Sequence, residues 1–235
     1  LEELIMQTDQ YSGADLCNGE EGSRVFAPEK LDEVFHGCSA GSIQMFALSV
    51  PESNEVQRYA VEKTSLCIPF LLTHEGLHGA SFKGSTVFPQ QIGLASSFEP
   101  ELAKKMGHAI AVESRCKVAR EVWSPVMDLM RDPRFGRTEE AYGEDTFLAA
   151  EFAREGVRGM QGDNLAAPDA VASELKHYAA YGSPVAGLNC APCAMSRHEV
   201  FTDSLPVFEA AVKDAGAMNV MCSYTCVGHV PVSMD

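Results

Sequence analysis

The chain has 235 residues, of which 46% are hydrophobic and 22% charged, which is ordinary for a folded protein with a sizeable core. Its 18 Lys and Arg residues against 33 Asp and Glu residues give a formal net charge of -15. This charge disfavours nucleic acid and anionic membrane surfaces as partners and favours a neutral substrate. No apolar stretch approaches the roughly 18 residues needed to cross a bilayer, and no secretory signal segment is visible.

Segments with helical periodicity alternate with short apolar runs along the chain. The first residues, Leu1-Glu2-Glu3-Leu4-Ile5-Met6, have the pattern of a helix interior, so we expect the natural N-terminus to lie upstream. Helices are expected over 28–36, 53–62, 100–116, 146–160 and 197–214, with Pro100 well placed at a helix start. Buried strands are expected over 42–49, 68–72, 122–126, 171–175 and 217–221.

This alternation of strands and helices predicts an α/β fold with a parallel sheet. No G-x-G-x-x-G follows any expected strand, which argues against an open dinucleotide-binding sheet and favours a (β/α)8 TIM-barrel-like domain. About five to six βα units fit into the chain, so we expect the barrel to be incomplete. No repeat or linker-like break is visible, and we therefore expect one domain over residues 1–235.

Polar residues follow several of these expected strands. They are Glu75, Asp128, the pair Lys176 and His177, and Tyr224, each at or just beyond the C-terminal end of a different strand. Because the C-terminal ends of parallel barrel strands form one face, we expect these side chains to converge on a site.

The densest polar stretch, residues 124–140, contains three Arg, two Asp and two Glu residues just after an apolar run. Pro and Gly within it fix the path of the chain, as is useful where Arg donors and carboxylate acceptors must be held in place. An Asp beside Arg131 and Arg134 is often an ion-paired loop anchor, and we favour that structural role for Asp132. The role of Asp128 is left open between anchor and ligand contact.

The same stretch, continued through Ala141-Tyr142-Gly143-Glu144-Asp145, resembles the DPRWGRxxEsyGED signature of glycoside hydrolase family 3, with Phe135 where most members have Trp. Four further motifs occur in family order, so that the resemblance covers roughly residues 68 to 231. They are Glu75-Gly76-Leu77-His78-Gly79, Thr86-Val87-Phe88-Pro89-Gln90, Lys176-His177-Tyr178-Ala179-Ala180-Tyr181-Gly182 and Met221-Cys222-Ser223-Tyr224. The resemblance implies a β-glucosidase or β-xylosidase that hydrolyses O-glycosyl bonds by a retaining mechanism without metal or organic cofactor.

The resemblance also implies roles for individual residues. Glu75, Arg137, Lys176 and His177 match family residues that hydrogen-bond the hydroxyls of the innermost sugar, and Tyr224 matches a Tyr that hydrogen-bonds the nucleophile. Asp128 and Met221 complete the expected substrate-binding set. The sixth position of the Lys176 motif is Tyr181 rather than His, which argues against the hexosaminidase branch.

A retaining glycosidase needs two carboxyl groups roughly 5 to 5.5 Å apart. In the resembled family both follow later in the chain, and Asp235 does not match the nucleophile motif. We therefore identify no catalytic residue and expect this chain alone to be inactive, with a C-terminal domain of the same enzyme as its missing partner. Family resemblance alone favours an extracellular or periplasmic location.

Other functions remain open at this point. One is a non-catalytic sugar-binding fragment. His74-Glu75-Gly76-Leu77-His78 fits the H-E-x-x-H zinc-hydrolase spacing, although an expected strand precedes it and two glycines disfavour the required helix. Lys176 beside His177 is a candidate Schiff-base lysine of an aldolase. Cys190-Ala191-Pro192-Cys193 has redox spacing, and Cys222 with Cys226 would add zinc ligands, but we favour buried free thiols.

Overall fold

The computed structural model describes residues 2–234, which form two compact units. The first comprises the residues up to His74 together with Cys116–Glu121, and the second comprises Glu75–Arg115 together with the residues from Val122 onward. Each unit is described below by itself. The expectation of one domain over the whole chain stays a prediction.

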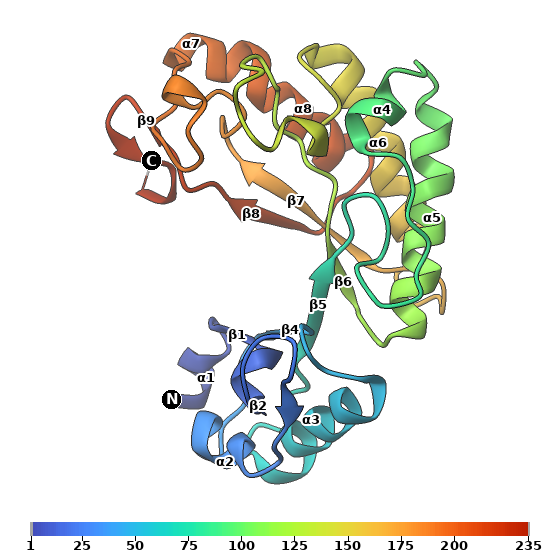
Figure 1. Ribbon diagram of the computed structural model, residues 1–235, viewed down its shortest axis with the longest axis vertical. Coiled ribbons are helices and arrows are strands. Elements are labelled where there is room, and N and C mark those ends of the chain that lie inside the picture. The colour runs from blue at the N-terminus through green and yellow to red at the C-terminus, as the bar shows by residue number, and fades with distance from the viewer. Residues whose placement is uncertain (1, 235) are drawn as a thin grey trace. The chain divides into compact units, whose positions relative to one another are not determined.

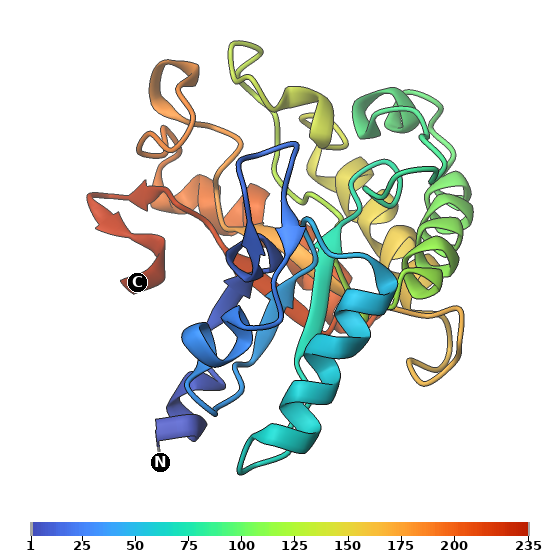
Figure 2. The same ribbon diagram turned by 60° about the horizontal axis from the view of Figure 1, so that its bottom comes forward.

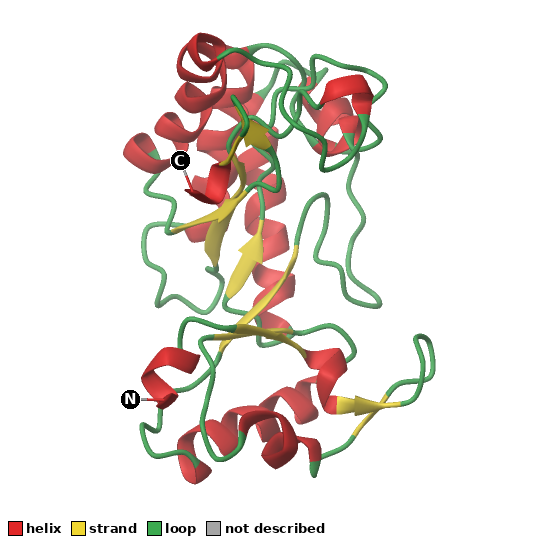
Figure 3. Cartoon of the chain, turned by 90° about the vertical axis from the view of Figure 1, so that its left-hand side faces the viewer, coloured by secondary structure: helices red, strands yellow, loops and turns green. Residues whose placement is uncertain are grey.

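The first unit contains a parallel sheet with the strand order β1-β4-β5. Gln10 of β1 (Gln10–Ser12) pairs with Ser42 of β4 (Ser42–Gln44), and Ser42 pairs in turn with Leu71 of β5 (Leu71–Glu75). A short antiparallel hairpin of β2 (Cys17–Asn18) and β3 (Val25–Phe26) projects from the rest of the unit (Figure 3). The helices of this unit are α1 (Glu2–Met6), the 3-10 helix η1 (Gly13–Leu16), α2 (Lys30–Phe35) and α3 (Val50–Lys63).

An aromatic cluster forms much of the core of the first unit. The ring of Phe35 lies 5.1 Å from Tyr11 and 4.9 Å from Phe70, measured between ring centroids. Helix α3 runs beside the segment that leads into β5 (Figure 2), where the Gln57 amide exchanges two hydrogen bonds with the backbone of Phe70. These contacts fix the entry of β5, the strand that ends at Glu75.

The second unit contains three of the parallel strands, in the order β6-β7-β8. Glu174 of β7 (Ala172–Tyr178) pairs with Asn219 of β8 (Asn219–Cys222), and just beyond β6 (Glu121–Trp123) Val126 forms a parallel bridge with Lys176. The α-helices are α4 (Gln91–Ala95), α5 (Pro100–Cys116), α6 (Thr146–Gln161), α7 (Arg197–Glu199) and α8 (Leu205–Glu209). The smaller elements are η2 (Thr138–Glu140), η3 (Val185–Gly187), η4 (Val200–Ser204), η5 (Ala210–Asp214), β9 (Cys226–Val227), β10 (Val230–Pro231) and η6 (Val232–Met234).

Helices α5 and α6 lie side by side (Figure 1), and glycines set the distance between them. A Cβ atom added to Gly107 would meet the carbonyl oxygen of Gly156 at 2.6 Å, and one added to Gly159 would meet that of Lys104 at 2.2 Å. The apolar faces of both helices pack on the strands and form one core cluster that includes Ile110, Phe152 and Leu175. The core supports the strand ends from which the polar residues project.

The predicted fold class is confirmed, because parallel strands follow one another in chain order and alternate with helices. All five expected strands and five expected helices are present. Strand β1 was not expected, and β5 runs over Leu71–Glu75 rather than 68–72 because polar Thr73 and His74 are buried within it. The expected helix over 197–214 is a continuous helical run in which η4 and η5 are π-helical. Among residues 2–234, no helix has the length and apolar character needed to cross a membrane.

The close approach of α5 and α6 leads to a prediction about stability. Gly159→Ala places a methyl group against a backbone oxygen, which cannot move aside as a flexible side chain could, so we expect the free energy of unfolding to fall by about 1–3 kcal/mol. Gly93→Ala in α4 is the matched control, because nothing lies within 4 Å of its added Cβ. Urea unfolding measures both. Equal stability of the two variants would contradict the packing described.

Candidate functional site

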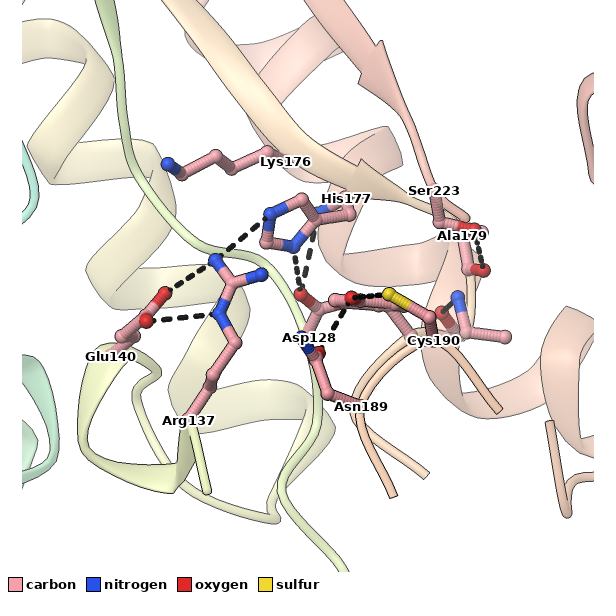
Figure 4. Close-up of polar contacts among 12 residues, drawn as sticks. Asp128, Arg137, Glu140, Lys176, His177, Ala179, Asn189, Cys190 and Ser223 are labelled. Atoms are coloured by element: carbon pink, nitrogen blue, oxygen red, sulfur yellow. Dashed lines mark hydrogen bonds and ion pairs between the residues drawn. The ribbon is translucent and has the colours of Figure 1, made fainter. Parts of the chain in front are cut away.

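Asp128, Lys176 and His177, expected site residues of the second unit, lie together in the structure (Figure 4), and Glu75 joins them through an ion pair with Lys176. Glu75 is the last residue of β5, Asp128 follows β6 by five residues, and Lys176 and His177 are consecutive residues of β7. The segment before Asp128 is tied to β7, because the Met127 amide donates to the Lys176 carbonyl and the Lys176 amide donates to the Pro125 carbonyl. This backbone pairing places Asp128 beside His177.

Lys176 forms an ion pair with Glu75 inside the site. Its ammonium group donates to both Glu75 carboxylate oxygens, at 2.9 and 2.7 Å, and its side chain is only 1% exposed. The Glu75 side chain is partly open to solvent, at 27% exposure. The pair therefore combines a partly exposed carboxylate with a buried cation.

Asp128 and His177 form a second buried pair, shown in Figure 4. One Asp128 oxygen, Oδ2, lies 2.7 Å from His177 Nδ1 and accepts from the His177 backbone amide at 3.3 Å. On the other side of the ring, the Arg137 guanidinium lies 3.2 Å from Nε2. Because a guanidinium can only donate, Nε2 accepts and the ring proton sits on Nδ1, which donates to Asp128. His177 is thus held as the neutral Nδ1–H tautomer.

Arg137 is oriented by Glu140, three residues later in the 3-10 helix η2. The guanidinium makes a fork of two hydrogen bonds to the Glu140 carboxylate, at 2.9 and 2.7 Å. Partial burial opposes the charge on Arg137, but the Glu140 carboxylate outweighs it and raises the pKa of Arg137 above its ordinary value. Arg137 is therefore a permanently charged donor in a fixed direction.

The assembled groups are suited to a ligand rich in hydroxyl groups. Carboxylates accept from hydroxyl hydrogens, whereas the guanidinium and ammonium groups donate to hydroxyl oxygens. The second oxygen of Asp128, Oδ1, is buried and has no hydrogen-bond partner among residues 2–234. A buried acceptor left without a donor costs about 1–3 kcal/mol, so a ligand hydroxyl or a water at this oxygen would remove the penalty.

Two expected residues are placed less centrally. Tyr224 follows β8 and is 72% exposed, with its ring 6.1 Å from that of Tyr181. Met221 lies half-buried within β8, which pairs with β7. Their expected roles stay predictions.

Asp132 is a loop anchor, in agreement with the role that we favoured. Its carboxylate accepts from Arg134 Nε and Nη2 and from the Arg134 backbone amide. These hydrogen bonds lower the pKa of Asp132 to about 2. Arg131 does not join this pair, since it donates to Asp203 at 2.6 Å instead.

Three residues near the site had received no role from the sequence. Glu140 orients Arg137, Tyr181 packs against His177 and Arg137, and Asn189 accepts from the Tyr181 hydroxyl. The spacing of three residues between Arg137 and Glu140 indicates a contact only within a helical turn, and the sequence did not predict the 3-10 helix η2. Tyr181 and Asn189 meet through the path of a loop, which no periodic pattern in the sequence encodes.

The geometry weighs against the other chemistries. His74 and Glu75 belong to strand β5, so the H-E-x-x-H residues do not share a helix face, and His78 uses Nδ1 to contact the Phe88 carbonyl. The Lys176 ammonium is engaged by two carboxylate oxygens, whereas a Schiff base needs a free amine. All eight cysteines are free thiols, as expected, but the expected burial is wrong, because only Cys17 is buried and four of the others are exposed. Within the described residues, no group of three or more His, Cys, Asp and Glu side chains is arranged to hold a metal ion.

Comparison with known proteins adds independent information. Residues 28–235 match the family described as Glycosyl hydrolase family 3 N terminal domain. A periplasmic β-glucosidase of Salmonella typhimurium is 33% identical over 207 residues, which are 88% of this chain and 26% of that protein. A putative β-xylosidase of Formosa agariphila is 36% identical over 73% of this chain and 23% of its own length. The chain thus spans about a quarter of the length of these curated relatives.

Solved structures agree with the sequence comparison. A β-glucosidase from Erythrobacter marinus superposes with a TM-score of 0.86 at 29% identity, covering 98% of this chain and 31% of that chain. A β-glucosidase from Listeria innocua in complex with glucose superposes with a TM-score of 0.85 at 32% identity, covering 100% of this chain and 33% of that chain.

The fork between Arg137 and Glu140 generates a prediction. Glu140→Ala leaves a half-buried guanidinium without its carboxylate, so we expect the free energy of unfolding to fall by about 1–2 kcal/mol, a value reduced for the partial exposure of the pair. The neighbouring Glu139→Ala removes an exposed carboxylate and should change stability by less than about 0.5 kcal/mol. Denaturant unfolding of the two variants measures the difference, and similar values for both would argue against the fork.

Proposed function

The chain belongs to glycoside hydrolase family 3, and we propose that it supplies the sugar-binding face of an enzyme that hydrolyses the O-glycosyl bonds of β-glucosides or β-xylosides. The names of its relatives support this substrate class, since they are β-glucosidases and β-xylosidases. The observation that carries the proposal is the convergence of Glu75, Asp128, Arg137, Lys176 and His177 at the strand ends of the second unit.

In the proposed complex, the ring hydroxyls of the terminal sugar occupy the space around this group. Glu75 and Asp128 Oδ1 accept from sugar hydroxyls, while Arg137 and Lys176 donate to sugar oxygens. Each of these side chains is already held by a partner of opposite charge or by His177, so little rotational freedom is lost when the sugar binds. Tyr224 and Met221 are proposed to contact the substrate from the side of β8.

We propose a retaining double displacement for the hydrolysis itself. One carboxylate attacks the anomeric carbon as the leaving oxygen is protonated by a second carboxyl group, and water then releases the sugar from the enzyme. Glu75 and Asp128 are poor candidates for these two roles, because Lys176 and His177 already engage their carboxylates. We place both groups in the sequence beyond Asp235, a residue that lies outside the described part of the chain.

The additional length of the relatives supports a further domain of the same enzyme as the partner that completes the site. The periplasmic relative supports a location outside the cytoplasm for this chain as well. Neither metal nor organic cofactor is part of the proposed reaction.

Calorimetric titration of this chain with glucose and with xylose tests the sugar site. Lys176→Met removes a buried donor and leaves Glu75 without its cation, so we expect sugar binding to weaken by about 10-fold to 100-fold. Lys83→Met is the matched control, because Lys83 is an exposed residue outside the site, and it should bind as the unaltered chain does. Equal binding by both variants would contradict the proposed role of Lys176.

Hydrolysis of p-nitrophenyl β-glucoside and β-xyloside tests whether turnover requires the sequence downstream of this chain. We expect no turnover by this chain and turnover by a version extended downstream through the rest of its gene. Activity in the short chain would instead assign the nucleophile to a carboxylate among Glu75, Asp128 and Asp235. Sugar binding without turnover in either version would favour the binding-only alternative.

A further inference from the structure

Tyr181 lies at the centre of the aromatic and cationic contacts behind the site. Its side chain is 1% exposed, and its ring centroid lies 4.8 Å from that of His177 and 5.7 Å from that of Phe135. The Arg137 guanidinium carbon lies 5.5 Å from the same centroid, within the range of a cation–π contact. One buried ring thus touches both sugar-site residues that meet at His177 Nε2.

The Tyr181 hydroxyl joins this group to the loop that follows β7. It donates to the Asn189 side-chain oxygen at 2.7 Å and lies 3.3 Å from the Cys190 sulfur. A phenol has one hydrogen, which Asn189 receives, so the Cys190 thiol is the donor in the second contact. Burial raises the pKa of Tyr181 to about 12, so the hydroxyl keeps its proton at physiological pH.

Residues 183–194 form a loop whose two ends are hydrogen-bonded to each other. The Val185 amide donates to the Pro192 carbonyl, and the Ala194 amide donates to the Ser183 carbonyl. Asn189 and Cys190 are exposed at the tip of this loop, whereas Tyr181 is buried beneath them. The hydroxyl of Tyr181 is therefore a direct link between the loop tip and the sugar-site residues.

We infer that Tyr181 is a positioning residue of the sugar site, which holds Arg137 and His177 with its ring and couples their placement to the loop 183–194 through its hydroxyl. This inference rests on the proposed function. Because coupling between two equilibria is reciprocal, a sugar that fixes Arg137 and His177 also restrains the loop tip, and a loosened loop tip weakens sugar binding.

Five variants of this chain test the inference by glucose titration. Tyr181→Phe keeps the ring and removes the link, so binding should weaken about fivefold, and Asn189→Ala should have the same effect. Since both changes break one bond, the double variant should also weaken binding about fivefold rather than the product of about 25-fold. Tyr178→Phe is the matched control, because Tyr178 is an exposed tyrosine at the end of β7, three residues before Tyr181, and it should bind as the unaltered chain does.

Tyr181→Leu removes the ring as well and should weaken binding by at least about 30-fold. Thermal melting of every variant separates this effect from stability. A purely structural role would lower the melting temperature in Tyr181→Phe and leave the glucose affinity of the folded protein unchanged, which would overturn the inference. Full multiplication of the Tyr181→Phe and Asn189→Ala effects would overturn the coupling.

Two measurements without sugar keep the inference testable if the unaltered chain binds neither glucose nor xylose, a result that would count against the proposed function alone. Nitrogen NMR of the His177 imidazole should report the Nδ1–H tautomer in the unaltered chain and a mixture of tautomers in Tyr181→Leu. Hydrogen exchange of the amides in 183–194 should be faster in Tyr181→Phe than in Tyr178→Phe. Unchanged imidazole signals together with unchanged exchange would overturn the positioning role.

Discussion

The site depends on a continuous series of hydrogen bonds between acidic and basic side chains. Glu140 holds Arg137, Arg137 donates to His177, and His177 donates to Asp128. Each contact fixes whether the next group donates or accepts. The guanidinium can only donate, so His177 Nε2 accepts and the ring proton lies on Nδ1. Two carboxyl groups, a guanidinium and an imidazole can therefore lie close together, because each contact joins a donor to an acceptor in a partly buried space where an unsatisfied polar group would be costly.

The scaffold explains why this series can form at a strand end. Backbone hydrogen bonds between residues 125–127 and Lys176 hold the loop after β6 alongside β7. Asp128 therefore lies next to the His177 amide. The buried side chains of Val126 and Phe135 in this loop pack with Tyr181 in a small apolar cluster. Phe135, which stands where the resembled family signature has Trp, packs edge-on against Tyr181 with 5.7 Å between the ring centroids.

The sequence allowed the strand-end residues to be predicted because their position follows from alternating apolar and polar runs. Glu75, Lys176 and His177 each mark the point where a buried strand gives way to polar residues. Strand β1 was not predicted because it has only three residues and its Gln10 is exposed. The predicted bounds of β5 were wrong because Thr73 and His74 are polar but buried. Glu140, Tyr181 and Asn189 act through turns and loop paths, where contacts between distant residues are not encoded by any local period.

The antiparallel bridge between Pro184 and Cys193 has a consequence for how such a protein can diversify. The bridge closes the backbone of the intervening segment on itself, and the Thr225 hydroxyl, which donates to the Ala191 carbonyl, ties that segment to the chain beyond β8. A change within residues 185–192 is then a local event where it keeps Asn189, which accepts from the Tyr181 hydroxyl, and the backbone acceptor at Ala191. Its exposed Val185 and Leu188 are positions where a substitution alters the surface of the loop while the contact between Tyr181 and Asn189 is kept.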